Sequence, residues 1–191
     1  ALRVDGPRWR GALPTASALA RGAGAVRACL DGLVAEVGAA AAVMDPVREG
    51  RLDEVAVAVG GRGPGLTPAG DDLLAGLLLV ARAAWGPDAV PRLADAAARS
   101  PTTEIAAAYL AWAARGQCLA PAHDVLAAVA REDADGTARA GRRLTAVGAT
   151  SGAHLAAGLA LGLRQLPRSA SQTASAGADP VLRHRAGRSP G

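Results

Sequence analysis

Residues 60–76, GGRGPGLTPAGDDLLAG, differ from the rest of the chain and decide how its fold is interpreted. Most of the 191-residue sequence is rich in alanine, leucine, valine and arginine. Here glycines and prolines precede a threonine and two adjacent aspartates, and an apolar segment follows at once. Thr67 is a suitable N-cap, Pro68 suits the first turn, and Asp71 and Asp72 would complement the helix dipole. The second half of the stretch therefore predicts the capped start of an apolar helix.

The glycines at the start of this stretch need a separate explanation. Gly60, Gly61, Gly63 and Gly65 fall within six residues, and each glycine costs backbone entropy on folding. Such a loop is expected where backbone amides face a ligand, and amides at a helix N-terminus bind phosphate or carboxylate. The adjacent aspartates are also able to hold Mg²⁺ through one carboxylate each and several waters. No lysine follows the glycines, which disfavours a P-loop nucleotide site. The loop thus predicts an anion site, a metal site, or both.

A similar pattern returns near the end of the sequence. Residues 68–82, PAGDDLLAGLLLVAR, and residues 150–164, TSGAHLAAGLALGLR, are identical at seven of fifteen positions, which include two glycine pairs and an arginine pair. We expect two similar loop–helix elements that pack side by side with their N-termini at the same end, although composition bias alone could produce the match. His154 aligns with Asp72, so both could face one pocket. His154 would then be a general base or ligand, or simply an interface histidine.

Helical patterns dominate the remaining sequence, because Ala and Leu are strong helix formers and aromatic residues are scarce. Residues 51–59 fit a strand or a helix, and we favour the helix because no partner strand is evident. Pro46 predicts a break, and Thr102 predicts the cap of a later helix. Further helices, one or two in the first range, are expected at residues 16–43, 68–84, 87–99, 102–115, 121–131, 137–147 and 150–164.

These patterns predict a mainly α, helical bundle-like domain over residues 1–165. A short extended segment is expected at its N-terminus. The small, polar, arginine-bearing residues 166–191 predict a disordered tail.

Charge and cysteine content exclude several classes of protein. The tail carries +3 of the net charge of +4, so the folded part is nearly neutral and lacks the basic stripe of nucleic-acid-binding proteins. No uninterrupted apolar run of about 18 residues predicts a membrane span. No signal peptide is visible, and Cys29 and Cys118 are isolated, as buried thiols of a reducing compartment are. We expect a cytoplasmic protein that binds neither nucleic acid nor membrane.

Several segments together resemble the AllH-like family, which includes a subunit of the three-part bacterial oxamate carbamoyltransferase. They are, in chain order, GRGPGLTPAGDD (61–72), LLAGLLL (73–79), TTEIAAAYLAWAARG (102–116) and GATSGAHLAAGLALGL (148–163). The resemblance covers roughly residues 5–165. It implies carbamoyl transfer between oxalurate or oxamate and phosphate, in purine or allantoin catabolism. It also implies partner subunits and a β-rich portion upstream of Ala1.

On this resemblance, the glycine-rich loop would bind a small anionic substrate or phosphate, with Asp71 and Asp72 as catalytic residues that bind metal or orient a substrate group. The candidate ligand-binding residues of the loop and its internal repeat are Gly63, Gly65, Thr67, Gly70, Thr150, Ser151, Gly152 and His154. The sequence indicates no definite cofactor, although the two aspartates could hold Mg²⁺. Two alternatives stay open: a non-catalytic scaffolding or regulatory subunit, and a metal-dependent all-α hydrolase that uses the paired aspartates.

Overall fold

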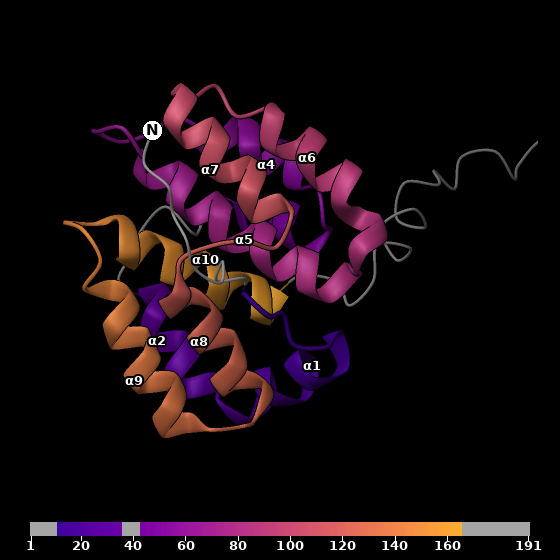
Figure 1. The fold of residues 1–191 in the computed structure, drawn as a ribbon, viewed down its shortest axis with the longest axis vertical. Coiled ribbons are helices and arrows are strands. Elements are labelled where there is room, and N and C mark those ends of the chain that lie inside the picture. The colour runs from indigo at the N-terminus through magenta and orange to yellow at the C-terminus, as the bar shows by residue number, and fades with distance from the viewer. Residues whose placement is uncertain (1–10, 36–42, 166–191) are drawn as a thin grey trace, which may run out of the picture.

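The computed structural model describes residues 11–35 and 43–165, and every regular element in these ranges is a helix (Figure 1). The mainly α prediction is therefore confirmed. The predicted tail at 166–191 and most of the predicted extended N-terminal segment lie outside the described residues. The elements are α1 (Ala16–Ala25), α2 (Arg27–Ala35), α3 (Met44–Arg48), α4 (Leu52–Val59), α5 (Ala69–Trp85), the 3₁₀ turn η2 (Pro87–Ala89), α6 (Val90–Ala98), α7 (Glu104–Ala114), α8 (Ala120–Ala130), α9 (Ala134–Thr145) and α10 (Ser151–Gln165).

Two of the ambiguous segments are resolved, and one prediction is wrong. Residues 51–59 form the helix α4, as predicted. The described part of segment 16–43 begins with two helices, which are separated at Val26. The break predicted at Pro46 is wrong, because this residue lies in the first turn of α3. The backbone N–H that proline lacks has no helical partner in a first turn, so the helix tolerates it there.

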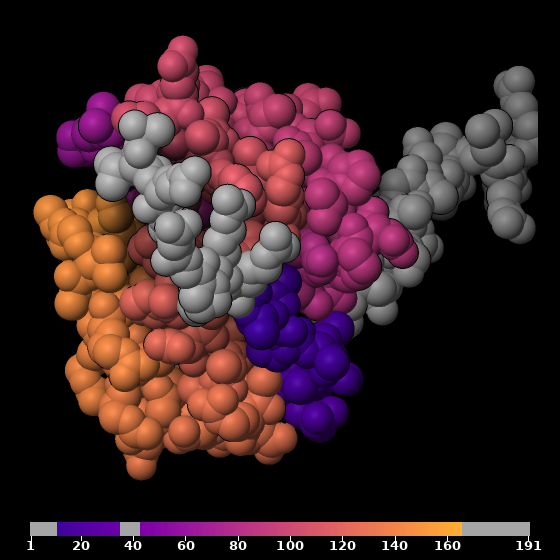
Figure 2. Space-filling view, in the orientation of Figure 1, coloured from indigo at the N-terminus to yellow at the C-terminus, as the bar shows by residue number. Residues whose placement is uncertain are grey.

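Helices α5 and α10 pack against each other and form the centre of the domain. On one side of this pair, α4, α6 and α7 contact α5; on the other, α2 and α9 contact α10, and α8 packs on α9 and α1 (Figure 1). Figure 2 shows the corresponding halves of the surface, with residues of α5 to α7 in magenta and pink above those of α8 to α10 in orange. No helix among the described residues has both the length and the apolar composition needed to cross a bilayer.

Two glycines allow α5 and α10 to touch through their backbones. A Cβ atom added at Gly76 would lie 2.5 Å from the carbonyl oxygen of Leu155, and one at Gly158 would lie 2.1 Å from that of Leu73. The internal repeat pairs residue 76 with 158 and residue 73 with 155, so the two contacts exchange under the repeat. The expected side-by-side packing is confirmed, and the two helices are related by a local twofold arrangement.

The first-turn glycines of the repeat have the same role in both copies. A Cβ atom at Gly70 would lie 1.9 Å from the carbonyl oxygen of Val59 in α4, and one at Gly152 would lie 2.0 Å from that of Leu144 in α9. Each copy of the repeat therefore starts against the last turn of the preceding helix. This contact explains both glycines by packing alone.

Replacing Gly158 with alanine is expected to lower the free energy of unfolding by about 3 kcal/mol or more, because the new methyl group meets a backbone that cannot move aside cheaply. The measurement is urea unfolding followed by circular dichroism. The matched control is Gly32→Ala on α2, where an added Cβ has no neighbour within 4 Å. The control is expected to be neutral or to stabilise by up to about 1 kcal/mol. Equal effects of the two substitutions would contradict the backbone contact.

Candidate functional site

The N-termini of α5 and α10 meet at one end of the central pair. The hydroxyl groups of Thr67, just before α5, and Ser151, the first residue of α10, are 3.2 Å apart and share a hydrogen bond. Both helix starts are therefore at the same end, as the internal repeat predicts. The meeting point lies between residues 84 positions apart in the sequence, so helix packing creates it rather than local structure.

Thr67 does not cap α5, and this prediction is wrong. The N-cap is Pro68, and no side chain bonds to the first-turn amides at that position. The hydroxyl group of Thr67 is engaged with Ser151 instead. The cap predicted at Thr102 is also one residue off, since Thr103 is the N-cap of α7 and accepts from the amide of Ala106. In both cases a long-range partner takes the threonine that local sequence assigns to a cap.

Asp71 is fully buried, and its carboxylate ties two loops to the start of α5. The hydroxyl group of Ser100 donates to Oδ1 at 2.7 Å, and that of Thr102 donates to Oδ2. The amide of Gly61 donates to the same carboxylate at 3.2–3.3 Å. These donors come from the glycine-rich loop and from the segment between α6 and α7. Asp71 therefore has the contacts of a structural anchor.

The first glycines of the loop are explained by this anchor. A Cβ atom at Gly60 would lie 2.2 Å from the Ser100 hydroxyl oxygen, and one at Gly61 would lie 2.2 Å from the Pro101 carbonyl oxygen. Gly61 also has a φ of +67°, which side chains rarely adopt. The two glycines let the loop lie directly on the segment that holds Asp71. Gly63 and Gly65 lie in the exposed turn that follows, both with positive φ.

Asp72, the next residue, faces a different environment. Its side chain is only 3% exposed, and its Oδ2 atom is buried without a hydrogen-bond partner among the described residues. Burial raises the pKa of this carboxyl to about 6, and the nearby charge of Asp71 adds to the rise. A hydrogen bond from Ser151 and the charge of His154 act in the opposite direction. An acceptor atom that burial removes from water without a partner is costly.

His154 lies near Asp72, as its place in the internal repeat predicts, and its effect on the Asp72 pKa reflects that. Its Nδ1 atom is 2.9 Å from the carbonyl oxygen of Thr150, one turn earlier in the same helix segment. Thr150 thus contacts His154 through its backbone carbonyl group. Gly152, which packs on α9, faces away from this group of side chains.

A pocket of about 270 Å³ opens beside Asp72. Its exposed walls are almost entirely apolar. Three of its polar lining residues lie at the two helix starts, and a fourth, Tyr109, comes from α7. No arginine is among its lining residues in the described ranges. The lining residues are Thr67, Asp72, Ile105, Tyr109, Leu119, Ser151 and Leu155.

Tyr109 and Cys118 form a second polar contact next to this pocket. The tyrosine hydroxyl group is 3.1 Å from the Cys118 sulfur. Burial raises the pKa of both groups, and the charge of Asp72 raises each further. Both therefore stay protonated at neutral pH, so Cys118 is a thiol with the properties of a packing group and hydrogen-bond partner rather than a nucleophile.

The two aspartates do not offer a shared metal site. Asp71 is directed to Ser100 and Thr102, whereas Asp72 is directed to Ser151. Adjacent residues on a helix point about 100° apart, which accounts for the separation. Among the residues that the structure describes, no three His, Cys, Asp or Glu side chains are grouped to hold a metal ion.

The sequence indicates Thr67, Asp72, Ser151 and His154. The structure places the first three on one pocket, and His154 is close enough for its charge to lower the pKa of Asp72. The sequence alone does not indicate the apolar wall formed by Ile105, Tyr109, Leu119 and Leu155, since no local pattern identifies a leucine or isoleucine as a pocket residue. It also misses the partners of Asp71. Adjacent hydroxyl residues at 100–103 are the signal that could have indicated them.

The pKa of Asp72 predicts a pH dependence of stability. Its folded-state pKa of about 6 exceeds the ordinary value of 3.8, so its contribution to folding is present at low pH and is lost as pH rises through about 6. Between about pH 4 and pH 7, the wild type is expected to lose up to about 3 kcal/mol relative to Asp72→Asn. Urea unfolding of both proteins over this pH range measures the difference. Parallel pH profiles would show that Asp72 titrates normally.

Asp71 and Asp72 are expected to differ in their effect on stability at neutral pH. Asp71→Ala leaves two hydroxyl groups and one amide without their acceptor, which should cost about 3 kcal/mol or more. Asp72→Asn removes a poorly solvated charge and should be neutral or stabilising. Thermal unfolding of the two variants checks this contrast, and a larger loss for Asp72→Asn would overturn the assignment of Asp71 as the anchor.

Comparison with known proteins supplies the family. The sequence profile of a family described as oxamate carbamoyltransferase subunit AllH matches residues 59–163, which include both copies of the internal repeat and every residue that lines the Asp72 pocket. Neither curated proteins nor solved structures gave a match. Since the match spans more than half of the 191 residues, the chain belongs to the AllH family of oxamate carbamoyltransferase subunits.

Proposed function

We propose that this chain is a subunit of an oxamate carbamoyltransferase and that the Asp72 pocket holds the carbamoyl or amide group of the substrate. The observation that carries the proposal is the buried Oδ2 atom of Asp72, which has no hydrogen-bond partner among the described residues. Asp72 lines one pocket together with Thr67 and Ser151, whose hydroxyl groups share a hydrogen bond. The pocket therefore offers one carboxylate acceptor that lacks a donor, and two hydroxyl groups that can both donate and accept hydrogen bonds. Family membership supports the reaction class.

A carbamoyl group matches this set of atoms. Its NH₂ group can donate two hydrogen bonds, and its carbonyl oxygen can accept hydrogen bonds from other groups. The NH₂ group would donate to Oδ2 of Asp72, while Ser151 keeps its hydrogen bond to the same carboxylate. The hydroxyl group of Thr67 would turn its hydrogen from Ser151 to the carbonyl oxygen. Such bonds satisfy the buried carboxylate and polarise the carbonyl bond for attack at carbon. With a pKa near neutrality, Asp72 is also suited to accept a proton from an attacking nitrogen.

The remainder of the substrate is anionic, and the described lining of the Asp72 pocket includes no cationic side chain for it. We assign the anionic end of the substrate to the exposed turn at Gly63 and Gly65, which lies just before Thr67. Its backbone amides are suited to a carboxylate or a phosphate. In this arrangement Asp71 is a positioning residue, because it fixes the loop through Gly61. The role in purine catabolism remains part of this proposal.

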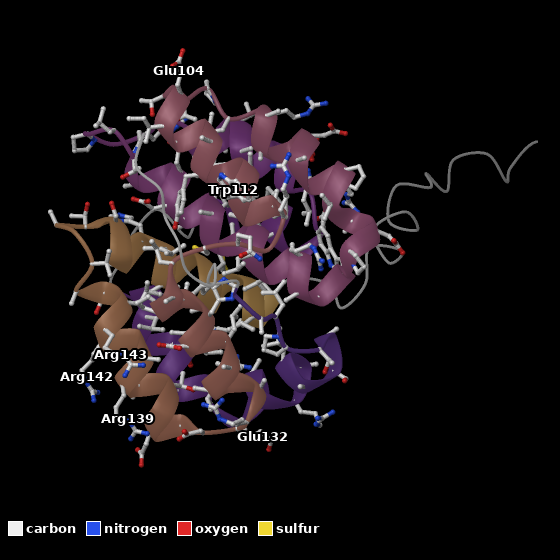
Figure 3. All side chains as sticks on the ribbon, viewed as in Figure 1. Glu104, Trp112, Glu132, Arg139, Arg142 and Arg143 are labelled. Carbon is white, nitrogen blue, oxygen red and sulfur yellow. The ribbon has the colours of Figure 1, made fainter. Side chains whose placement is uncertain are left out.

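Other subunits of the enzyme are the expected partners. Ile105 and Trp112 lie two turns apart on α7, on one face, and their side chains are 54% and 59% exposed. Figure 3 shows Trp112 on the side of α7 that faces the viewer. Ile105 and Leu119, which is 38% exposed, also line the Asp72 pocket. A partner that covers this apolar surface would close the pocket and exclude water from it.

Activity of the assembled enzyme tests the proposal. Asp72→Asn is expected to lower turnover about 100-fold, because asparagine replaces the carboxylate acceptor without changing its size. Ser151→Ala should lower turnover by about tenfold. The control is Asp88→Asn in η2, an exposed carboxylate remote from the pocket in sequence, with unchanged turnover. Co-purification of the subunits shows whether each variant assembles.

A purely scaffolding subunit gives a different result. Its Asp72→Asn variant would assemble and turn over within a factor of about two of the wild type. That outcome would contradict the proposed role of the pocket and favour the non-catalytic alternative.

A further inference from the structure

The local twofold arrangement of α5 and α10 also relates two arginines in their last turns. Arg82 and Arg164 occupy equivalent positions of the internal repeat, ten residues after Asp72 and His154 respectively. Both are partly buried, and the Nε atom of each is buried without a hydrogen-bond partner among the described residues. The two guanidinium groups thus have similar burial, and each lies in the last turn of its helix.

Their counterions differ. Arg164 forms a salt bridge with Asp31 of α2, with 2.9 Å between Nη1 and Oδ1. Arg82 forms no salt bridge among the described residues. A helix C-terminus favours a cation by itself, which would explain both arginines in part. Arg164, however, has a carboxylate partner in addition to its helix terminus. Asp31 thus shows where an anion pairs with the arginine of this repeat position. We infer that the equivalent place beside Arg82 can hold an anion as well.

In place of a carboxylate, Arg82 lines a pocket of about 550 Å³. Arg115, at the end of α7, lines the same pocket, as do Thr15 at the start of α1 and Gln117 after α7. No aspartate or glutamate is among the lining residues that belong to the described part of the chain. The pocket therefore combines two positive charges with neutral polar groups.

The neighbouring backbone holds the two arginines at this pocket. Arg115 donates from Nη1 to the carbonyl oxygen of Ala111 at 2.8 Å, which fixes its guanidinium group at the end of α7. Gly116 follows with a φ of +85°, and a Cβ atom there would lie 3.2 Å from Cγ of Arg82 and 2.7 Å from Cδ1 of Leu13. The glycine lets the stem of Arg82 pass close to this turn.

We propose that Arg82 and Arg115 bind a small carboxylate or phosphate anion. Guanidinium groups offer paired donors that match both kinds of anion. The site is separate from the Asp72 pocket, because ten residues of α5 place Arg82 about 15 Å along the helix from Asp72. It does not depend on the function proposed for that pocket. The arginines of α9, by contrast, point outward from the domain (Figure 3), and Arg143 pairs with Asp124.

Titration of the full chain with inorganic phosphate and, separately, with acetate tests this site, with amide chemical shifts in NMR spectra as the readout. Saturable shifts at Arg115, Gly116 and Gln117 with either anion are expected, and the stronger ligand identifies the anion class. Arg82→Gln and Arg115→Gln should each weaken binding by at least about tenfold. Arg115 is exposed, so its variant keeps the test meaningful if Arg82→Gln fails to fold.

Two control variants sharpen the result. Arg164→Gln removes the equivalent arginine of the repeat and should leave anion binding unchanged. Asp72→Asn should also leave it unchanged, which separates this site from the Asp72 pocket. Absence of saturable binding of both anions, or equal binding by wild type and Arg115→Gln, would overturn the proposal. Loss of binding in Asp72→Asn with retention in Arg115→Gln would likewise overturn it and place the anion in the other pocket.

Discussion

The backbone contact between α5 and α10 at Gly76 and Gly158 is the constraint on which the remaining structure depends. A Cβ atom at either glycine would overlap the opposite backbone, so no other residue type permits this approach without displacing a helix. The contact lets the two helices approach until their backbones touch, with both N-termini at the same end. It therefore brings their N-termini together and places Thr67 against Ser151. Most of the surrounding helices then pack on one member of the pair, whereas α1 contacts both.

The two helix starts are equivalent in backbone but not in side chains, and this difference creates the site. Gly70 and Gly152 pack on the preceding helix in the same manner. Asp72, however, stands where the other copy has His154. A buried carboxyl and a half-buried imidazole thus occupy equivalent positions at the two neighbouring helix starts. At the opposite end of the pair, Arg164 has the counterion that Arg82 lacks among the described residues.

Much of the fold follows from the sequence, because helical periodicity and the internal repeat are local patterns. Leu52, Val55, Ala56 and Val59 have helical spacing and are the buried residues of α4. The roles of Asp71 and Asp72 do not follow in this way. Both suit a first turn equally well, and only the distant Ser100, Thr102 and Ser151 distinguish them. The helix caps fail for the same reason, since tertiary partners of Thr67 and Thr102 outweigh local preference.

Asp72 is a buried carboxyl whose Oδ2 atom lacks a hydrogen-bond donor, and a bound ligand would supply an N–H group to it. Its titration, followed by NMR of the ¹³C-labelled carboxyl carbon in the assembled enzyme, tests this claim most directly. Without substrate, the pKa of Asp72 is expected to be about 6. With bound oxamate, donation from the amide NH₂ group should lower this pKa. A pKa that is unchanged or raised by oxamate would contradict the account.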